Sequence, residues 1–203
     1  MQERAIETRN NILKAAVALF ARKGLDGATV DDIAQAANAN KQRIYAYFGS
    51  KQKLFEAALI DVFQQVELFS KSTVANAEEP PEKMTEILLE GFIRVHAAQP
   101  ELWRLLAWAN LAGQDCVRSL SQARKAENEA LKEIFEKAVK EGLLKEISFE
   151  SYLFTLLAAS CFLHSNRHSL EYTINVNFTD AWNKQLCQDL NSVFQIPPNK
   201  KEN

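Results

Sequence analysis

The sequence has few cysteines, and none of them stands in a pattern typical of metal binding or cross-linking. Cys116, Cys161 and Cys187 are odd in number and far apart, so no zinc-type spacing is present and a disulfide framework is not expected. Glycine-rich phosphate loops and nucleophile motifs are missing as well. We therefore expect no catalytic residues, no metal site and no cofactor, and we do not expect an enzyme.

Long apolar runs are also absent, so we expect neither a membrane-spanning segment nor a signal peptide. No stretch is long and apolar enough to span a bilayer. Charged residues at Arg4, Glu7 and Arg9 interrupt the region where a signal peptide would need an apolar run. Together with the cysteine pattern, these absences predict a cytoplasmic protein with no membrane partner.

An overall excess of basic charge is missing, but the charge is unevenly distributed. The formal net charge is −2, which excludes a uniformly basic nucleic-acid binder. Residues 1–53 nevertheless carry nine Lys or Arg against five Asp or Glu, a net charge of +4, and the remainder carries −6. A basic first quarter on an acidic remainder is typical of a protein that binds DNA with one end only.

The stretch from Thr29 to Lys53 has the pattern of two short helices and the start of a third. Thr29 can cap the first helix, and apolar residues then recur at helical spacing. The turn at 38–40 suits asparagine, and Asn40 can cap the second helix. Gly49 ends the second helix, and Ser50 caps the third.

Cations stand at the starts of two of these helices, where they oppose the helix macrodipole. Lys41 and Arg43 lie in one first turn, and Lys51 and Lys53 lie in the next. Each cation there costs roughly 0.3–1 kcal/mol, so folding alone would favour Asp or Glu. Helix starts with Lys or Arg are suited to phosphate, which predicts contacts with a DNA backbone. Arg4 and Arg9 could also reach phosphate, although Arg4 could equally belong to a solvated helix end.

Two sequence patterns carry a resemblance to a known family. They are Thr-Val-x-x-Ile-Ala-x-x-Ala at 29–37 and Asn-Lys-x-x-Ile-Tyr-x-Tyr-Phe-Gly-Ser-Lys at 40–51. Over about residues 5–60 the chain resembles the helix-turn-helix of TetR-family transcriptional regulators. Asn38 departs from the usual turn glycine, and Gln42 and Arg43 replace small residues, so we expect an operator that differs from those of better-known members.

The resemblance implies a set of DNA-binding residues. Base contacts are expected from the start of the second helix, and Arg43 and Gln42 are the side chains that suit guanine and adenine. Backbone contacts are expected from the tyrosines and the following lysine. The full predicted set is Thr29, Asn40, Lys41, Gln42, Arg43, Tyr45, Tyr47 and Lys51.

The rest of the chain also follows helical periodicity, which predicts an all-α fold of about nine helices. We expect a three-helix head at 1–53 and a helical ligand-binding and dimerisation domain at 54–203, joined by a helix over about 51–75. The other predicted helices span 3–23, 81–98, 101–112, 115–141, 149–166 and 179–194, and the tail 197–203 is expected to be disordered.

Two residue sets in this second domain are candidates for function. Aromatic and polar residues that could line an effector pocket, as the resemblance implies, are Phe69, Phe92, His96, Trp103, Trp108, Asn110, Phe154, Phe162 and His164. Aromatics at helical spacing can equally form an ordinary core. The helix at 149–166 is apolar all round, which indicates burial by a second chain or closure of the monomer core. The predicted homodimer interface comprises Tyr152, Leu156, Leu163, Trp182, Leu186, Leu190 and Val193.

Two functions remain open at this stage. The first is a ligand-responsive transcriptional regulator, most simply a repressor that a small-molecule effector releases from a palindromic double-stranded operator. The second is a dimeric DNA-binding regulator that has no effector and acts by recruiting a partner.

Overall fold

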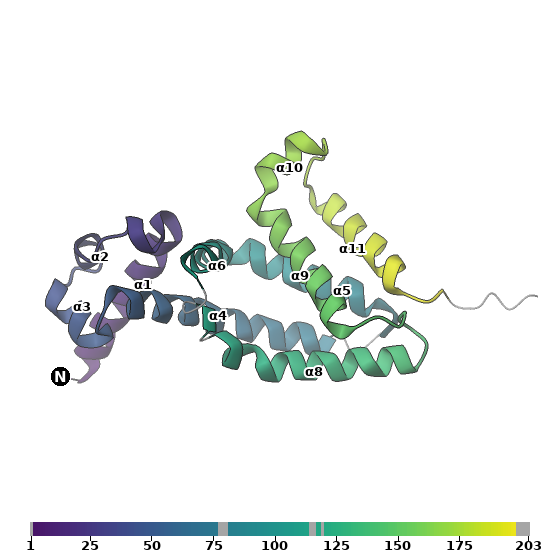
Figure 1. Cartoon of the computed structure of the whole chain (residues 1–203), viewed down its shortest axis with the longest axis horizontal. Helices are drawn as coiled ribbons and strands as arrows, with labels where there is room; N and C mark the ends of the chain where they lie inside the picture. The colour runs from purple at the N-terminus through teal and green to yellow at the C-terminus, as the bar shows by residue number, and fades with distance from the viewer. Residues whose placement is uncertain (1, 77–80, 114–116, 119, 198–203) are drawn as a thin grey trace, which may run out of the picture. The chain divides into compact units, whose positions relative to one another are not determined.

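The computed structural model of the chain describes residues 2–76, 81–113, 117–118 and 120–197 (Figure 1). Over these residues the fold is all-α, as predicted, and contains no β-strand. Cys116 and the tail 198–203, which was predicted to be disordered, lie outside the described residues. The elements are α1 (Gln2–Gly27), α2 (Val30–Ala36), α3 (Lys41–Phe48), α4 (Lys51–Asn76), the 3-10 helix η1 (Pro81–Lys83), α5 (Met84–Ala98), α6 (Pro100–Ala112), α8 (Leu120–Lys140), α9 (Phe149–Ser165), α10 (Arg167–Thr173) and α11 (Asp180–Phe194).

These elements pack into two compact units. Unit 1 consists of Met1–Val66 and Gln99–Arg124, and unit 2 consists of Glu67–Ala98 and Lys125–Asn203. The sequence analysis placed a domain boundary at residue 53, because residues 1–53 were expected to bind DNA. The two units described here are instead defined by which helices pack together. Helix α6 belongs to unit 1 because it packs along α1.

The core of unit 1 joins α1 to the helices that follow it. Apolar residues spaced along one side of α1, among them Ile12, Ala16 and Phe20, are fully buried. The ring of Phe20 meets that of Phe55 on α4 edge to face, with 5.2 Å between centroids. From α6, Leu102, Leu105 and Ala109 are buried as well. This packing holds α2 and α3 on a rigid support.

Gly24 breaks the helical geometry of α1 and makes room for α6. Its φ of 72° lies in the left-handed region, and α1 bends there. The sequence had predicted that the helix would end just before this glycine. A Cβ built on Gly24 would lie 2.7 Å from two ring atoms of Trp108 on α6. The absence of a side chain at Gly24 therefore lets the indole of Trp108 lie directly against the backbone of α1.

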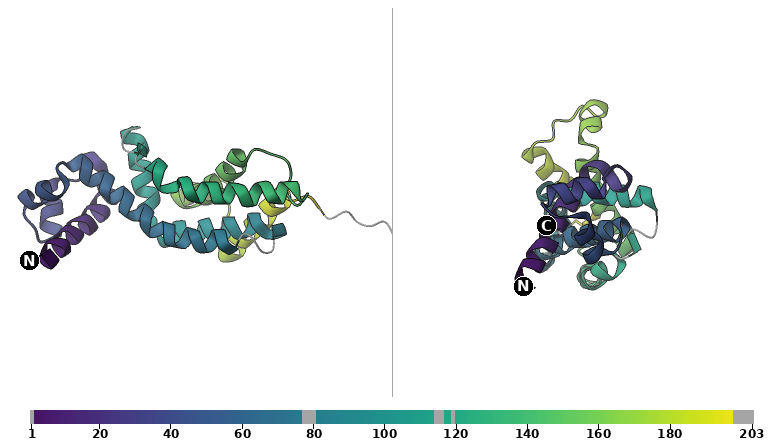
Figure 2. Two further views of the ribbon diagram at one scale, coloured as in Figure 1. Left: turned by 90° about the horizontal axis from the view of Figure 1, so that it is seen from below. Right: turned by 90° about the vertical axis from the view of Figure 1, so that its left-hand side faces the viewer.

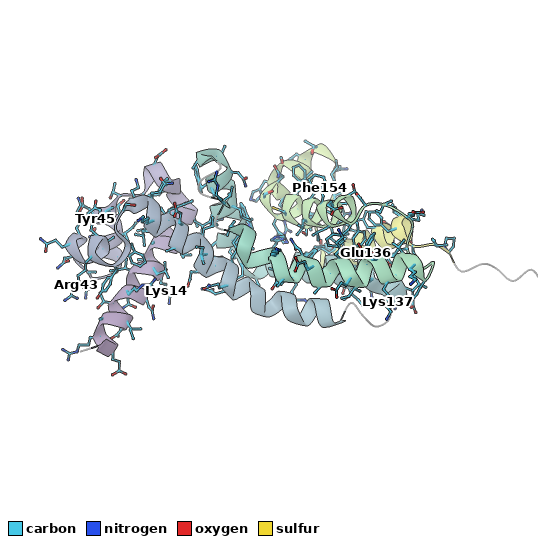
Figure 3. All side chains as sticks on the ribbon, turned by 60° about the horizontal axis from the view of Figure 1, so that its bottom comes forward. Lys14, Arg43, Tyr45, Glu136, Lys137 and Phe154 are labelled. Atoms are coloured by element: carbon cyan, nitrogen blue, oxygen red, sulfur yellow. The ribbon has the colours of Figure 1, made fainter. Side chains whose placement is uncertain are left out.

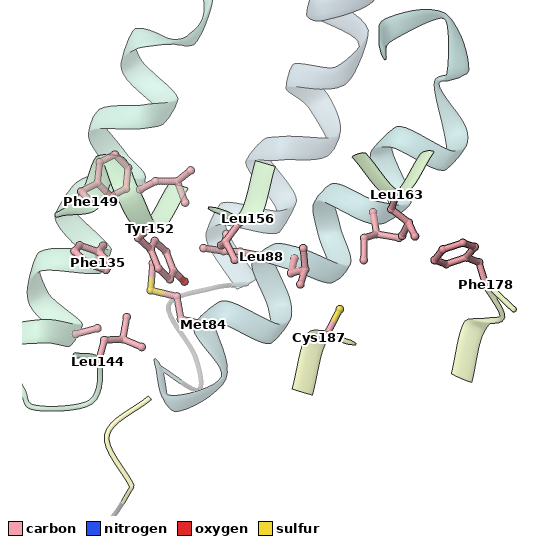
Figure 4. Packing of buried hydrophobic residues seen from close by; sticks show 14 residues of the cluster. Met84, Leu88, Phe135, Leu144, Phe149, Tyr152, Leu156, Leu163, Phe178 and Cys187 are labelled. Atoms are coloured by element: carbon pink, nitrogen blue, oxygen red, sulfur yellow. The ribbon is translucent and has the colours of Figure 1, made fainter. Parts of the chain in front are cut away.

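The core of unit 2 is built mainly from α5, α8, α9 and α11 (Figure 4). Tyr152 on α9 is 1% exposed and packs against Phe135 and Phe194, with ring centroids 4.8 and 5.1 Å away. The Tyr152 hydroxyl and Thr85 Oγ1 are 3.0 Å apart and share a hydrogen bond. Burial raises the pKa of Tyr152 to about 12, so the phenol stays protonated and available for that bond.

Helix α10 was not predicted, and it connects α9 to α11 at one end of that pair (Figures 1 and 2). The Arg167 guanidinium donates to the backbone oxygen of Phe178 at 3.0 Å and to Glu171 at 3.1 Å. It also lies over the Phe178 ring at 5.9 Å. The bond from Arg167 to Phe178 joins residues eleven apart in the sequence. Helical periodicity does not reveal such a contact, so the sequence did not predict α10.

Candidate nucleic-acid interface

Helices α2 and α3 both begin at a side-chain cap, as predicted. Thr29 Oγ1 accepts a hydrogen bond from the backbone N–H of Asp32 at 3.0 Å. Asn40 Oδ1 accepts one from the backbone N–H of Arg43 at 2.8 Å. Each cap satisfies a backbone donor that would otherwise have no partner at the helix start. Asn38, in the turn between the helices, takes a φ of 49°, a conformation that asparagine tolerates well.

The outer face of α3 presents its polar side chains to solvent. Ile44 and Phe48 are buried in the core of unit 1, whereas Tyr45 and Ala46 between them are exposed. Figure 3 labels Arg43 and Tyr45 on this outer side. Lys41, Gln42 and Arg43 are exposed, and Tyr45 is 43% exposed. A short helix whose polar N-terminal face is open has the form of a helix that enters a DNA groove.

Two ion pairs fix α2 to its neighbours at this face. Lys41 Nζ lies 3.0 Å from Asp31 Oδ2, and Lys23 Nζ lies 2.8 Å from Asp32 Oδ2. The hydrogen bond that Lys41 donates to Asp31, reinforced by the charge of that carboxylate, raises the pKa of Lys41. The hydrogen bond from Lys23, followed by that from Thr29, lowers the pKa of Asp32. All four groups are partly or largely exposed, so each pair contributes little to stability.

The junction of α3 and α4 brings the remaining predicted residues together. Gly49 takes a φ of 79° between the helices, and Ser50 Oγ accepts the backbone N–H of Lys53 at 3.1 Å. Tyr47 is half-buried, with its ring edge-on to Phe48 at 6.5 Å. Lys51 is half-buried at the start of α4. The eight predicted residues thus lie on the segment from the start of α2 to the start of α4.

The sequence that forms this arrangement matches models of a known protein family. The family model described as bacterial regulatory proteins of the tetR family matches residues 12–58. A second model, described as a tetracyclin repressor-like C-terminal domain, matches residues 80–192. The chain belongs to the TetR family. It is therefore a DNA-binding transcriptional regulator with a helix-turn-helix in unit 1.

Relatives of this TetR-family chain carry names of regulators. It is 31% identical over 185 residues to a protein of Pseudomonas putida (strain KT2440) named HTH-type transcriptional repressor NicS, covering 88% of this chain and 85% of the relative. It is 41% identical over 106 residues to a Streptomyces coelicolor protein named HTH-type transcriptional repressor SCO4008, covering 51% of this chain and 50% of the relative.

Solved structures share the whole fold of the TetR-family chain. A TetR-family transcription regulator from Marinobacter aquaeolei superimposes with a TM-score of 0.75 at 20% identity, covering 96% of this chain and 99% of the other. HlyIIR, a hemolysin II transcriptional regulator, superimposes with a TM-score of 0.68 at 20% identity, covering 95% and 99%. At this identity the likeness shows the fold alone.

The structure separates the residues predicted to line an effector pocket. Trp103, Trp108 and Asn110 lie on α6 in unit 1, where Trp108 packs against Gly24 and the Asn110 amide donates to the Leu106 backbone oxygen. Phe154 and Phe162 are 72% and 54% exposed, and they line a groove on the surface of unit 2 instead of an enclosed cavity. The Phe69 side chain lies outside the described part of the chain.

Two histidines of the predicted set do lie together in unit 2. The rings of His96 on α5 and His164 on α9 are 6.2 Å apart between centroids. His164 Nε2 lies 3.1 Å from the backbone oxygen of Ile93 and forms a hydrogen bond with it. Burial lowers the pKa of His164, and the charge of Arg167 lowers it further, while the bond to Ile93 opposes both. Phe92, also in the predicted set, is half-buried on α5 beside this unit's core.

The predicted dimer interface needs correction on α9. Tyr152 and Leu156 are 1% and 0% exposed inside the unit 2 core, where α9 packs along α5 and Tyr152 also meets the Phe194 ring of α11, so they cannot meet a second chain. Leu163 is 5% exposed and forms part of the floor of a surface groove of about 450 Å³ between α9, α10 and α11. We call this the α9–α11 groove; its lining is Phe154, Thr155, Ala158, Ala159, Phe162, Leu163, Leu170, Ile174, Phe178, Trp182 and Leu186.

The α11 residues of the predicted interface lie closer to solvent than those of α9. Trp182 and Leu186 line the α9–α11 groove, Leu190 is half-buried, and Val193 is 54% exposed. Sequence reasoning placed Phe154 and Phe162 on a helix of the predicted interface but left them out of the residues named for it. It also missed Asp31 as the partner of Lys41, because no local pattern pairs residues ten apart.

Two further findings concern the described residues as a whole. No helix among them is both long enough and apolar enough to cross a membrane. Over the same ranges, no three or more His, Cys, Asp or Glu side chains gather in a group that could hold a metal ion.

Proposed function

We propose that this TetR-family regulator is a repressor that binds a palindromic operator as a homodimer and leaves it when a small molecule binds unit 2. The observation that carries the proposal is the open polar face of α3, from Lys41 to Tyr45, held between two capped helix starts. The relatives named as transcriptional repressors support the direction of regulation.

Within the operator complex, base recognition is assigned to the exposed start of α3. Arg43 suits a guanine edge and Gln42 an adenine edge, and each good pair is worth about 1–3 kcal/mol of discrimination. Thr29, Tyr45, Tyr47 and Lys51 are assigned to backbone phosphates, which position the helix without reading sequence. Asn40 acts by fixing the start of α3 through its cap. Lys41 contributes once it exchanges Asp31 for the DNA.

The homodimer forms through the α9–α11 groove, whose lining includes the exposed rings of Phe154 and Phe162. Exposed apolar patches of this kind mark interaction sites on soluble proteins. A two-fold interface presents the same patch on both chains, so Phe154 and Phe162 of one copy can face the groove of the other. Two heads joined this way must reach successive major grooves, which are about 34–36 Å apart.

The effector is assigned to the region around His96 and His164 in unit 2. Two neighbouring imidazoles offer hydrogen-bond donors and acceptors among apolar side chains of α5 and α9. A polar small molecule bound there would shift the separation of the two heads only if it binds the DNA-free arrangement more tightly. The alternative, a regulator that recruits a partner and has no effector, needs no such site.

The function is tested by selecting duplexes from a random pool with the full-length chain and sequencing those retained. The proposal expects a two-fold symmetric consensus, with two chains per duplex by light scattering. A screen of small molecules for release of the bound duplex then separates the two functions, because only the effector-responsive repressor is released. An absence of sequence preference at low salt would refute operator binding itself.

A further inference from the structure

Arg9, on α1, lies over an aromatic ring at the end of α3. The Arg9 guanidinium carbon is 5.1 Å from the centroid of the Phe48 ring, within the range of a cation–π contact. Phe48 is only 8% exposed, because the rest of its ring is packed into the core of unit 1. The exposed cation on α1 is therefore held against a fixed surface of α3.

The surroundings of Arg9 leave its charge available. In unit 1, the ammonium groups of Lys23 and Lys41 each pair with a carboxylate, whereas Arg9 forms no ion pair within the described residues. Contact with a ring uses the flat face of the guanidinium and leaves the N–H donors along its edge free. Those donors are arranged as a fork that matches two phosphate oxygens.

The position of Phe48 places this fork next to the proposed phosphate contacts. Phe48 directly follows Tyr47 and precedes the Gly49–Lys51 turn into α4. We propose that Arg9 is a further DNA-backbone contact, supplied by α1 and held at the C-terminal end of the recognition helix by Phe48. This inference rests on the proposed operator binding and adds to it a contact from outside the helix-turn-helix.

The contact has a defined consequence for binding. A phosphate held by Arg9 fixes how deeply the end of α3 lies in the groove, but it carries no base information. Its loss should therefore weaken binding to every duplex and make binding less dependent on salt.

The test compares Arg9→Ala with Arg22→Ala, which removes one exposed arginine from the other end of the same helix. Affinity for the selected operator is measured over a range of salt concentrations, together with thermal unfolding to confirm folding. Arg9→Ala should weaken binding about tenfold and reduce the salt slope by about one per protomer. Arg22→Ala should have less effect on both. Arg9→Lys should keep the slope but lose affinity, because lysine lacks the fork.

A second measurement identifies the phosphate. Single uncharged methylphosphonates are placed along the operator and tested with the wild-type chain and with Arg9→Ala. One position should weaken the wild type and have no further effect on Arg9→Ala. If every position weakens both equally, or if Arg9→Ala binds like Arg22→Ala, the inference fails while wild-type operator binding stands. If the wild type prefers no duplex, the proposed function fails instead.

Discussion

Lys41 Nζ lies 3.0 Å from Asp31 Oδ2, so the first turn of α3 is tied to the first turn of α2 before DNA is bound. Both side chains are exposed, at 49% and 72%, which makes the pair weak and easily exchanged. A phosphate that approaches Lys41 must displace Asp31 and also meets the negative charge of that carboxylate. Asp31 therefore opposes DNA binding in this unit.

The first prediction concerns the substitution Asp31→Asn. Removing the carboxylate should free Lys41 and strengthen binding to all duplexes about threefold to tenfold, with a steeper salt dependence. Loss of an acidic residue from the first turn of α2 should cost less than about 1 kcal/mol of unfolding free energy. Fluorescence anisotropy over a salt series measures the effect. Asp26→Asn, which removes another exposed carboxylate in unit 1, is the control, and equal behaviour of the two variants would contradict the competition.

The second prediction separates base reading from backbone contact on the same face. Arg43→Ala should relax the consensus at one position per half-site, at a cost of about 1–3 kcal/mol for the preferred base. Lys51→Ala should weaken all duplexes alike and flatten the salt dependence by about one unit of slope per protomer. Selection from a random pool with each variant measures both effects. Identical consensus changes in the two variants would show that this division of roles is wrong.

The third prediction concerns Gly24 and Trp108, where α1 meets α6. Gly24→Ala forces a side chain onto a φ of 72° and places its Cβ 2.7 Å from the Trp108 ring. Strain of this kind costs about 1–3 kcal/mol, which denaturant unfolding can measure. The double variant with Trp108→Ala removes the clash but keeps the backbone strain, so the coupling between the two substitutions gives the steric part. Strictly additive losses of unfolding free energy would show that the Trp108 ring moves aside without a steric penalty.

The fold could be predicted where local chemistry determines it. The caps at Thr29 and Asn40 mark helix starts in the sequence, and in the structure both side chains accept a hydrogen bond from a backbone N–H at the helix start. Helix α9 is different, because nearly every residue is apolar and no stripe indicates its inner side. Packing of α9 along α5, with the Tyr152 ring against those of Phe135 and Phe194, decides that Tyr152 is buried and Phe154 exposed. The ion pair of Lys41 likewise depends on the angle between two helices.

The fourth prediction tests the outer side of α9. Phe162→Arg places a charge in the α9–α11 groove and should convert the proposed dimer to monomers at micromolar concentrations, because an unpaired charge would be buried at the interface. Light scattering after gel filtration measures the mass. Leu111→Asp, at an exposed apolar residue of unit 1, is the control and should leave the mass unchanged. A variant at Phe162 that keeps the wild-type mass and fold would exclude this surface as the interface.

The fifth prediction concerns the protonation of His164. Its pKa is lowered in the folded chain, chiefly by burial and also by Arg167, so the unfolded chain takes up a proton more readily. Stability should thus be complete above the ordinary histidine pKa of about 6.5 and fall as the pH drops from there through the folded-state value. His164→Gln, which keeps a hydrogen-bonding side chain without a titrating ring, should reduce the difference between the unfolding temperatures at about pH 7.5 and about pH 5.5. His168→Gln, at a histidine on α10 whose side chain is 97% exposed, is the matched control. If both variants keep the wild-type pH dependence, another group must carry the acid sensitivity, and His96 beside the His164 ring is the next to test.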